Sequence, residues 1–454
     1  MLGEILRIGF ERQHVLLDKG ACTPAQILDL GRKSEVHAGD SHCGKEWDGL
    51  NFSLSRGRNK HAGNAFMLDP SPAPLAQFSL DADQIAVRDM ARAFADKALA
   101  PNAVAWDETR HFPVAEMRQA AELGMGGIFV SEDFGGSGLS RLSATLIFEA
   151  LATGCPTVAA YMSIHNMTAS LIDAYGSDEQ RKLWLPKLCT MEYLASYCLS
   201  EPGVGSDAAA LTTRAVRDGD HYALNGQKQF ISGAGSGDLY VVMARTGGGG
   251  SSGISAFVVP GDTPGISFGA SERKMGWNAQ PTRAVMFQDA RVPVDNLLGR
   301  VGLGFKIAMA GLDGGRLNIA ACSLGGAQTA LDKSLAYMKE RKAFGKRLDE
   351  FQSLQFRLAD MATGLEASRA LLLRAAAALD CHHSNATQLS AMAKRFVTDT
   401  CFDIANQALQ LHGGYGYLSE YGIEKIVRDL RVHQILEGTN EIMRLIVARS
   451  LVGR

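Results

Sequence analysis

A single carboxylate near the C-terminus, Glu437, stands among apolar neighbours. Ile435 and Leu436 precede it and Gly438 follows it. Apolar residues at helical spacing over residues 423–435 predict a helix that stops at Gly438. A carboxylate in an apolar pocket has a raised pKa, which suits a general base that removes a proton near neutral pH. On these residues alone, a surface glutamate beside a turn is the stronger interpretation.

Two glycine-rich runs, residues 202–206 and 410–414, could bring main-chain groups close to a ligand. A plain turn is the stronger interpretation of the first run by itself. In the second, His412 precedes two glycines, which also fits the C-terminal cap of a helix. The histidines at 165, 412 and 433 have no metal-ligand partners at suitable spacing, so we expect structural roles and no metal site.

The elements that position these residues follow an α, β, α order. From Asp81 to about Tyr193, apolar residues recur at three- and four-residue spacing, which predicts helices. The glycine-rich loop 133–138 interrupts them.

From about Leu194 to Leu303 the spacing changes toward two, which predicts a compact β domain. Asn225-Gly226 follows the first expected strand and is typical of a tight hairpin turn. The expected strands cover residues 221–224, 238–243, 254–259 and 283–287.

After Gly304, apolar residues repeat at the spacing of a four-helix bundle. Thr439 or Asn440 is expected to cap a last helix that starts at Glu441. The sequence thus predicts a mainly α protein with a central β domain. Its expected parts are an N-terminal extension (1–77), a helical domain (78–193), a middle β domain (194–303) and a C-terminal helical bundle (304–454).

Composition favours a protein that acts on small molecules. The 454 residues are 46% hydrophobic and 21% charged, and the net charge of -2 gives no basic field for nucleic acid or an anionic membrane. None of the eight cysteines forms a CxxC pair, which fits free thiols in a reducing compartment. No apolar segment approaches the roughly 20 residues that a membrane span needs.

The first 66 residues show no sustained helical or strand period. A mitochondrial transit peptide is nearly free of acids, yet Glu4, Glu11 and Asp18 lie within the first 20 residues. We therefore favour a cytoplasmic bacterial protein, with the mitochondrial matrix expected if the source is eukaryotic. Met67 is an alternative start, which an intact-mass measurement of the native protein would test.

Three segments together resemble the acyl-CoA dehydrogenases. They are Tyr197-Cys-Leu-Ser-Glu-Pro-Gly-Val-Gly-Ser-Asp207, Glu340-Arg-Lys-Ala-Phe-Gly345 and the C-terminal run from Gln407 to Asn440. The resemblance covers residues 78–452 and implies an N-terminal helical domain, a middle β-barrel domain and a C-terminal four-helix bundle. It also implies FAD, an acyl-CoA substrate, a homotetramer and an electron-transfer flavoprotein as electron acceptor.

The resemblance assigns chemistry to Glu437, which matches the base that removes the α-proton of the thioester while the β-hydrogen leaves as hydride to flavin N5. The α-proton is too weakly acidic for a carboxylate alone, so donors such as the Glu437 N–H must polarise the carbonyl. Some relatives carry the base at the position of Gly315, which has no side chain for it. Asp313 is the rival carboxylate.

The resemblance also implies contacts with FAD and substrate. Segments around Arg341 and Gln410 are expected to reach the FAD of a neighbouring subunit, where an arginine fork suits a diphosphate. Expected FAD-binding residues are Tyr197, Cys198, Leu199, Ser200, Gly205, Ser206, Phe230, Ile231, Ser232, Arg341, Phe344, Gln410, Leu411, His412, Gly413, Gly414, Thr439, Asn440 and Glu441. Expected substrate-binding residues are Ser206, Asp313, Gly314, Gly315, Arg316, Leu436, Gly438 and Arg449, although Arg449 fits a solvated charge equally well.

Leu436 bears on the choice of substrate. Straight-chain members commonly place Tyr before the base, and a mobile aliphatic side chain makes room for a branch at Cα. Ile164-His165-Asn166, residues 276–282 and residues 435–437 are most similar to members that oxidise isobutyryl-CoA to methacrylyl-CoA in valine breakdown. The alternatives are a 2-methylbutyryl-CoA or short-chain acyl-CoA dehydrogenase, an oxidase, or a flavoprotein scaffold without turnover.

Overall fold

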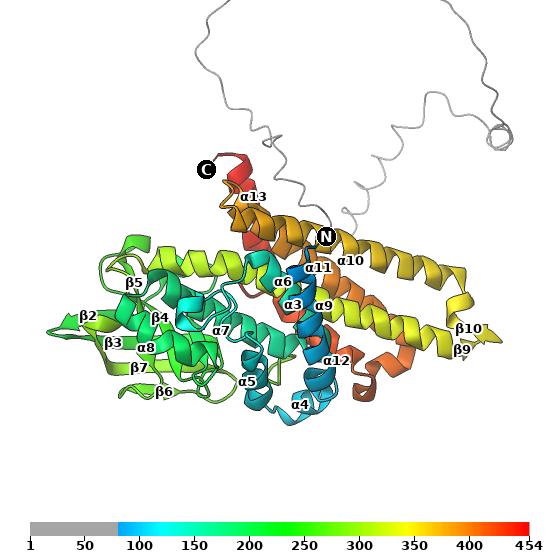
Figure 1. Cartoon of the computed structure of the whole chain (residues 1–454), viewed down its shortest axis with the longest axis horizontal. Helices are drawn as coiled ribbons and strands as arrows, with labels where there is room; N and C mark the ends of the chain where they lie inside the picture. Colours follow the sequence, from blue (N-terminus) through cyan, green and yellow to red (C-terminus); the bar gives the residue numbers. More distant parts are fainter. Residues whose placement is uncertain (1–79, 454) are drawn as a thin grey trace, which may run out of the picture. The chain divides into compact units, whose positions relative to one another are not determined.

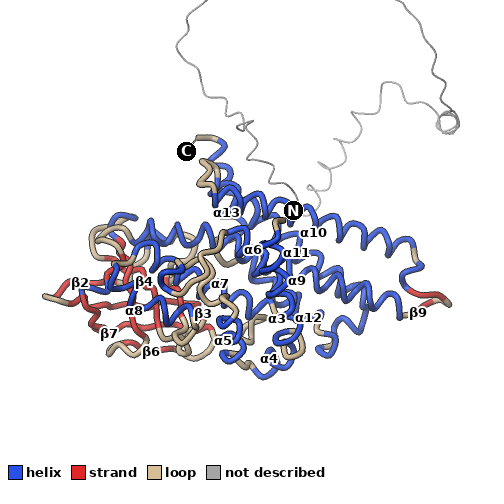
Figure 2. The backbone as a smooth tube through the Cα atoms, viewed as in Figure 1, coloured by secondary structure: helices blue, strands red, loops and turns tan. Residues whose placement is uncertain are grey.

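Helices precede and follow a central sheet in the computed structural model, which describes residues 80–453 (Figure 1). The expected extension (1–77) and the alternative start at Met67 therefore lie outside the described residues. The α, β, α order that the sequence predicts is confirmed, and Figure 2 shows the strands of the central sheet gathered at one end of the helices.

Side-chain caps fix where the first helices begin. Asp81 accepts a hydrogen bond from the N–H of Gln84, and Ser177 accepts one from the N–H of Gln180; both complete a capping box. Ser140 caps the helix over residues 141–154 by accepting a hydrogen bond from the N–H of Ser143. The helices are α3 (Ala82–Phe94), the π-helix η1 (Ala95–Leu99), α4 (Ala103–Thr109), α5 (Val114–Glu122), α6 (Arg141–Gly154), α7 (Pro156–Tyr175) and α8 (Asp178–Cys189).

The strands form one eight-stranded sheet in the order β6-β7-β3-β2-β4-β5-β8, and β1 pairs in parallel with β4. The expected strands are all present, some of them longer than predicted. Their bounds are β1 (Ala195–Cys198), β2 (Arg214–Asp218), β3 (His221–Ser232), β4 (Leu239–Arg245), β5 (Ile254–Pro260), β6 (Ile266–Phe268), β7 (Thr282–Pro293) and β8 (Leu297–Leu298).

The hairpin turn expected at Asn225-Gly226 is wrong. These residues lie inside β3, where the pairing with β7 shifts register between Leu224 and Gly226. Gly226 has a φ of +146°, and a Cβ there would come within 2.6 Å of the Thr213 side chain. The glycine therefore serves a β-bulge rather than a turn.

Each face of the sheet contributes residues to a buried apolar cluster. One face packs against α7, α8 and the start of the first long helix through residues such as Leu171, Leu185 and Ile307. The other face encloses a separate cluster that includes Tyr222, Tyr240 and Phe257. The first cluster fixes the sheet against the helices, whereas the second is made of residues from the sheet domain itself.

Three long helices follow the sheet: α9 (Gly304–Glu340), α10 (Gln352–Asp380) and α11 (Ala386–His412). Their apolar residues join those of α3, α6 and α7 in a single core. A short hairpin, β9 (Lys342–Ala343) and β10 (Lys346–Arg347), lies at the end of α9 far from the sheet (Figure 1).

The chain ends in two short helices joined by a bend. These are α12 (Ile423–Arg431) and α13 (Asn440–Leu451), and the 3-10 turn η9 (Val432–Gln434) lies between them. Thr439 caps α13 by accepting a hydrogen bond from the N–H of Ile442 at 3.3 Å. The predicted cap is confirmed, and the helix begins one residue earlier than expected.

The six cysteines within residues 80–453 are free, and Cys381 alone among them is exposed. No helix in this described range is long and apolar enough to cross a membrane.

A buried polar contact fixes the sheet domain against α12 and η9. Asp429 accepts from the main-chain N–H of Trp277 at 2.7 Å, and the Trp277 indole donates to His433 Nε2 at 3.2 Å. His433 Nδ1 therefore carries the proton and donates to Ser323 Oγ at 2.7 Å. Burial lowers the pKa of His433 to about 3, so the imidazole is neutral.

We expect Trp277→Phe to destabilise the protein by about 1–3 kcal/mol, because it leaves His433 Nε2 buried without a donor. Chemical denaturation measures the change. Trp184→Phe is the matched control, because the indole N–H of Trp184 has no partner among the described residues. Equal losses in the two variants would show that ring size, rather than the hydrogen bond to His433, sets the cost.

Candidate active site

Glu437 lies in the bend between η9 and α13 with an unusual backbone conformation. Its φ is +56°, and the next residue, Gly438, has a φ of +87°. A left-handed conformation costs a glutamate about 1–2 kcal/mol, so the surroundings must hold it in place. Among the described residues, the main-chain N–H of Glu437 has no hydrogen-bond acceptor.

The carboxylate of Glu437 faces Gly315 on α9. A Cβ at Gly315 would come within 2.7 Å of Glu437 Oε2 and 3.1 Å of Met167 Sδ. Oε2 is closed off from solvent and has no hydrogen-bond partner in the described part of the chain. Burial raises the pKa of Glu437 to about 7, although Arg316 and Lys394 act against the increase. Glu437 thus carries an isolated carboxylate in a bend between two helices, rather than the surface glutamate that its sequence neighbours alone favour.

Two cations donate hydrogen bonds to the main-chain carbonyls of Glu437 and Gly438. Arg316 Nε donates to the carbonyl oxygen of Glu437 at 3.4 Å. Lys394 Nζ donates to the carbonyl oxygen of Gly438 at 2.8 Å and to Asn440 Oδ1 at 2.9 Å. Both cations lie near the carboxylate, yet neither donates to its Oε2.

Both oxygens of Asp313, the rival carboxylate, already accept hydrogen bonds. Its Oδ1 accepts from Arg316, and its Oδ2 accepts from Thr387 Oγ1 at 2.8 Å. Proton abstraction by Asp313 would require breaking these bonds, whereas Glu437 Oε2 is unpaired within the described chain. The geometry favours Glu437 as a base.

The segments expected to contact flavin lie side by side at the edge of the sheet. The N–H of Gln229 donates to Ser200 O at 2.9 Å, and Ser196 Oγ donates to Ser232 O at 2.7 Å. Buried Lys228 joins them further by donating to Leu199 O at 3.1 Å and to Glu201 Oε1 at 2.8 Å.

Tyr197 connects this edge to the Glu437 region. Its hydroxyl donates to Ala308 O at 3.3 Å on α9. The pKa of Tyr197 is raised well above its usual range, first by burial and then by the charge of Glu437. The predicted flavin edge and the predicted base therefore lie close together.

Exposure divides the flavin-edge residues into two groups. Cys198, Leu199 and Ile231 are buried and belong to the packing of the sheet. Gly205 and Ser206 are exposed. Phe230 is 67% exposed with a φ of +60°, so an apolar ring lies on the surface on a residue whose main chain is strained.

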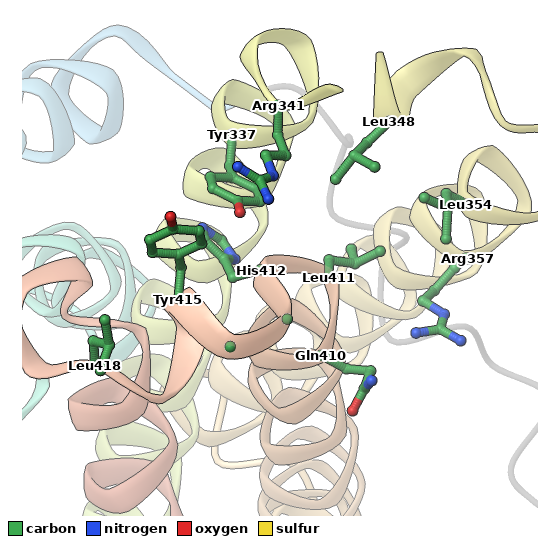
Figure 3. A pocket seen from close by; sticks show the side chains of 12 residues that line it. Tyr337, Arg341, Leu348, Leu354, Arg357, Gln410, Leu411, His412, Tyr415 and Leu418 are labelled. Atoms are coloured by element: carbon green, nitrogen blue, oxygen red, sulfur yellow. The ribbon is translucent and has the colours of Figure 1, made fainter. Parts of the chain in front are cut away.

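A second site lies at the far end of α9 and α11, in a pocket of about 600 Å³. It brings together the Arg341 and Gln410 segments, which the sequence assigns to one cofactor. In Figure 3, Tyr337 and Arg341 from the end of α9 face His412 and Tyr415. The residues that line it are Tyr337, Arg341, Leu348, Leu354, Arg357, Gln410, Leu411, His412, Gly413, Gly414, Tyr415 and Leu418.

The charge of this pocket suits an anion. The residues that line it include Arg341 and Arg357 but no acidic residue of the described chain. The Arg341 guanidinium lies 5.3 Å from the centre of the Tyr415 ring. His412 stacks on Tyr337, and burial lowers its pKa, which favours the neutral imidazole.

The two sites are far apart. Lys394, beside Glu437, and Gln410, in the pocket, are both on α11; at about 1.5 Å per residue they are about 24 Å apart along the helix. Glu437 and the pocket of one subunit therefore cannot hold the same small group.

Several predicted residues lie outside both groups of contacts. Phe344 is 96% exposed at the tip of the β9–β10 hairpin and does not line the pocket. Arg449 is exposed in the last turn of α13, and Glu441 is exposed at its start. Asn440 is buried and serves the protein interior, because its Nδ2 donates to Asp399 Oδ1 at 2.6 Å.

Sequence reasoning missed Lys394, Met167 and Gln280. Met167 contacts the space between Gly315 and Glu437, and Gln280 donates to Ser232 Oγ at 3.3 Å. Lys394 lies on the apolar face of a helix, next to Ala393. A lysine at a core position was the available signal, since buried lysines are rare unless paired.

Comparison with known protein families covers nearly all of the described chain. The acyl-CoA dehydrogenase N-terminal domain matches residues 81–192, the middle domain residues 196–290 and the C-terminal domain residues 302–452. The fold that the sequence resemblance implies is thereby confirmed.

Individual relatives are similar over most of their length. The mitochondrial isobutyryl-CoA dehydrogenase of Bos taurus is 56% identical over 385 residues, covering 85% of this chain and 91% of the relative. The corresponding enzyme of Dictyostelium discoideum is 54% identical, covering 85% and 92%. The structure of butyryl-CoA dehydrogenase from Megasphaera elsdenii is 38% identical with a TM-score of 0.80, covering 83% of this chain and 99% of that one. The chain therefore belongs to the acyl-CoA dehydrogenase family and is an oxidoreductase.

Proposed function

We propose that this enzyme is an FAD-dependent dehydrogenase of short 2-methyl-branched acyl-CoA thioesters. The favoured reaction converts isobutyryl-CoA to methacrylyl-CoA, a step of valine breakdown. The observation that carries the proposal is the unpaired, desolvated carboxylate of Glu437 in the described chain, and the similarity to two isobutyryl-CoA dehydrogenases supports the choice of substrate.

Glu437 acts as the base that removes the α-proton. With a pKa of about 7, the carboxylate is largely ionised at slightly alkaline pH and remains basic enough to accept a proton. Its Oε2 has no competing donor among residues 80–453. The free N–H of the same residue can donate to the thioester carbonyl, which lowers the pKa of the α-proton.

FAD, when bound, accepts the β-hydrogen as hydride. The edge formed by Ser200, Ser206 and Phe230 fits a flavin ring, because an exposed phenyl ring held on a left-handed backbone is favoured by an apolar cover. A Cβ at Gly205 would meet nothing within 4 Å in the described chain, so packing does not explain this glycine. Close approach of a ligand to the main chain would explain why this position has no side chain.

The pocket at Arg341 and Gln410 fits the diphosphate of FAD bound by a neighbouring subunit. It combines two arginines with Gly414, where a Cβ would also meet nothing within 4 Å of the described residues. It lies about 24 Å along α11 from the Glu437 region, which supports a role toward the FAD of another copy of the chain. This arrangement supports the proposed homotetramer.

Leu436 supports a branched substrate. It is half-buried beside the base and packs on the helical core. A leucine can change rotamer, whereas a tyrosine presents a flat ring to the reacting carbon. A 2-methylbutyryl-CoA or short-chain acyl-CoA dehydrogenase is the nearest alternative.

The electron acceptor and the compartment are further proposals. We infer that an electron-transfer flavoprotein reoxidises the enzyme in the cytoplasm of a bacterium or in the mitochondrial matrix of a eukaryote. Anaerobic addition of isobutyryl-CoA should bleach the flavin, and the acceptor should restore its colour. Rapid recovery of colour with O₂ alone would indicate an oxidase, and no bleaching by any acyl-CoA would indicate a scaffold.

Glu437→Gln should reduce kcat by at least about 10³-fold and leave flavin content unchanged, because it removes the base without changing the size of the side chain. In the wild type, log(kcat/KM) should rise with pH and level off above about 7. Stopped-flow bleaching of the flavin between pH 5.5 and 9 measures the rate loss in the variant and the pH dependence of the wild type. Full activity in this variant would exclude Glu437 as the base.

The same substitution should stabilise the protein at alkaline pH. The folded-state pKa of about 7 exceeds the ordinary value of 4.5, so the wild type loses up to about 3 kcal/mol of stability as pH rises through this range. The substituted amide side chain does not ionise and avoids this loss. Denaturation at pH 8 should therefore favour the variant, while denaturation at pH 4 should show little difference.

Leu436→Tyr should shift specificity away from branched substrates. We expect kcat/KM for isobutyryl-CoA to fall about tenfold or more relative to butyryl-CoA, since one methyl group in a fitted pocket changes discrimination by about 10–200-fold. Leu445→Tyr, at an exposed position on α13, is the control for general effects of a new tyrosine. A wild-type enzyme that prefers butyryl-CoA or octanoyl-CoA would contradict the proposed substrate.

A further inference from the structure

We propose that Lys394 is a positioning residue for the base: it holds the Glu437–Gly438 bend through the Gly438 carbonyl and tunes the carboxylate electrostatically without bonding to it. This inference rests on the proposed role of Glu437. It extends that role to a residue on a different helix, α11, which the reaction does not touch.

The geometry around Lys394 favours this role. The side chain is fully buried, and its ammonium group donates to Gly438 O at 2.8 Å and Asn440 Oδ1 at 2.9 Å. Asn440 is oriented in turn by Asp399, at 2.6 Å, and by Thr398 Oγ1, at 3.0 Å. Because a buried charge is costly without partners, these bonds fix the position of the ammonium group closely.

The target of the bond distinguishes positioning from simple pairing. A salt bridge between Lys394 and the carboxylate would occupy a lone pair that must accept the α-proton, and would make the carboxylate a weak base. Lys394 instead bonds the carbonyl of the following residue and leaves Glu437 Oε2 without a partner in the described chain. The hydrogen bond from Lys394 to the Gly438 carbonyl therefore helps to hold the left-handed conformation of Glu437 and Gly438.

Arg316 and Lys394 are the charges that act on Glu437, and further groups on the neighbouring elements act on these two. Asp313 offsets part of the charge of Arg316 by direct pairing, and Asp399 offsets part of the charge of Lys394. Burial lowers the pKa of Lys394 to about 8, and the charges of Glu437 and Asp399 act against this decrease. The groups are Arg316 and Asp313 on α9, Lys394 and Asp399 on α11, Glu441 and Arg444 on α13, and Tyr197 on β1.

Three substitutions separate charge from packing. Lys394→Met removes the charge and the donor; Lys394→Gln removes the charge but keeps a polar donor; Lys394→Arg keeps the charge. In the first two, the rise of kcat/KM with pH should move to higher pH by about one unit, which is about a tenfold loss at pH 6 and a much smaller loss at pH 9. Lys394→Arg should keep the wild-type pH dependence even if kcat falls.

Thr398→Val is the matched control, because it weakens the same polar cluster without changing its charge. It should lower stability and leave the pH dependence in place. A purely structural Lys394 would give the same result in Lys394→Met and Lys394→Gln: a lower Tm with an unmoved profile. That outcome overturns the proposal, and Lys394→Gln decides it if Lys394→Met does not fold.

Infrared difference spectroscopy gives a readout that does not need turnover. The carbonyl stretch of protonated Glu437, assigned by its loss in Glu437→Gln, should persist to higher pH in Lys394→Gln than in the wild type. An unshifted titration contradicts the role of Lys394 even if the enzyme is inactive. Failure of the wild type to bleach its flavin with any acyl-CoA, or full activity of Glu437→Gln, would instead overturn the proposed function.

Discussion

The structure around the candidate site depends on keeping one carboxylate out of water without giving it a partner. An ionised carboxylate in such a place is costly, and the usual remedy is a salt bridge. Here the nearby cations bond to main-chain carbonyls, with Arg316 on Glu437 O and Lys394 on Gly438 O. Arg316 and Lys394 therefore stabilise the ionised carboxylate without bonding to Oε2, and the pKa of Glu437 is about 7 rather than higher.

This arrangement constrains the surrounding elements. Gly315 has no side chain because a Cβ would meet the carboxylate at 2.7 Å, so α9 can pass close to the bend. The bend is in turn attached to the sheet domain, since Trp277 bonds Asp429 and His433 just upstream of it. The position of the base thus depends on contacts from both helical regions and from the sheet.

Much of this could be predicted from the sequence, and the reasons for the exceptions are physical. Periodicity identified the α, β, α order because apolar spacing reports burial directly. The hairpin expected at Asn225-Gly226 was wrong because that dipeptide tolerates positive φ in a bulge as well as in a turn. Lys394 was missed because a lysine on a helix is normally solvated, and its burial depends on contacts with residues 438 and 440. The roles of the predicted site residues and the domain boundaries remain predictions.

In the proposed function the C-terminal segment contributes to two separate sites, because a long helix divides it. Residues 410–414 and Glu437 are close in sequence, but α11 places Gln410 about 24 Å from the lysine that holds the bend at Glu437. Under the proposed function, the base at one end of α11 and the anion pocket at the other serve different parts of the reaction machinery. The proposed assembly with a second copy would let both ends of the helix contribute to catalysis, which would link oligomerisation to the chemistry.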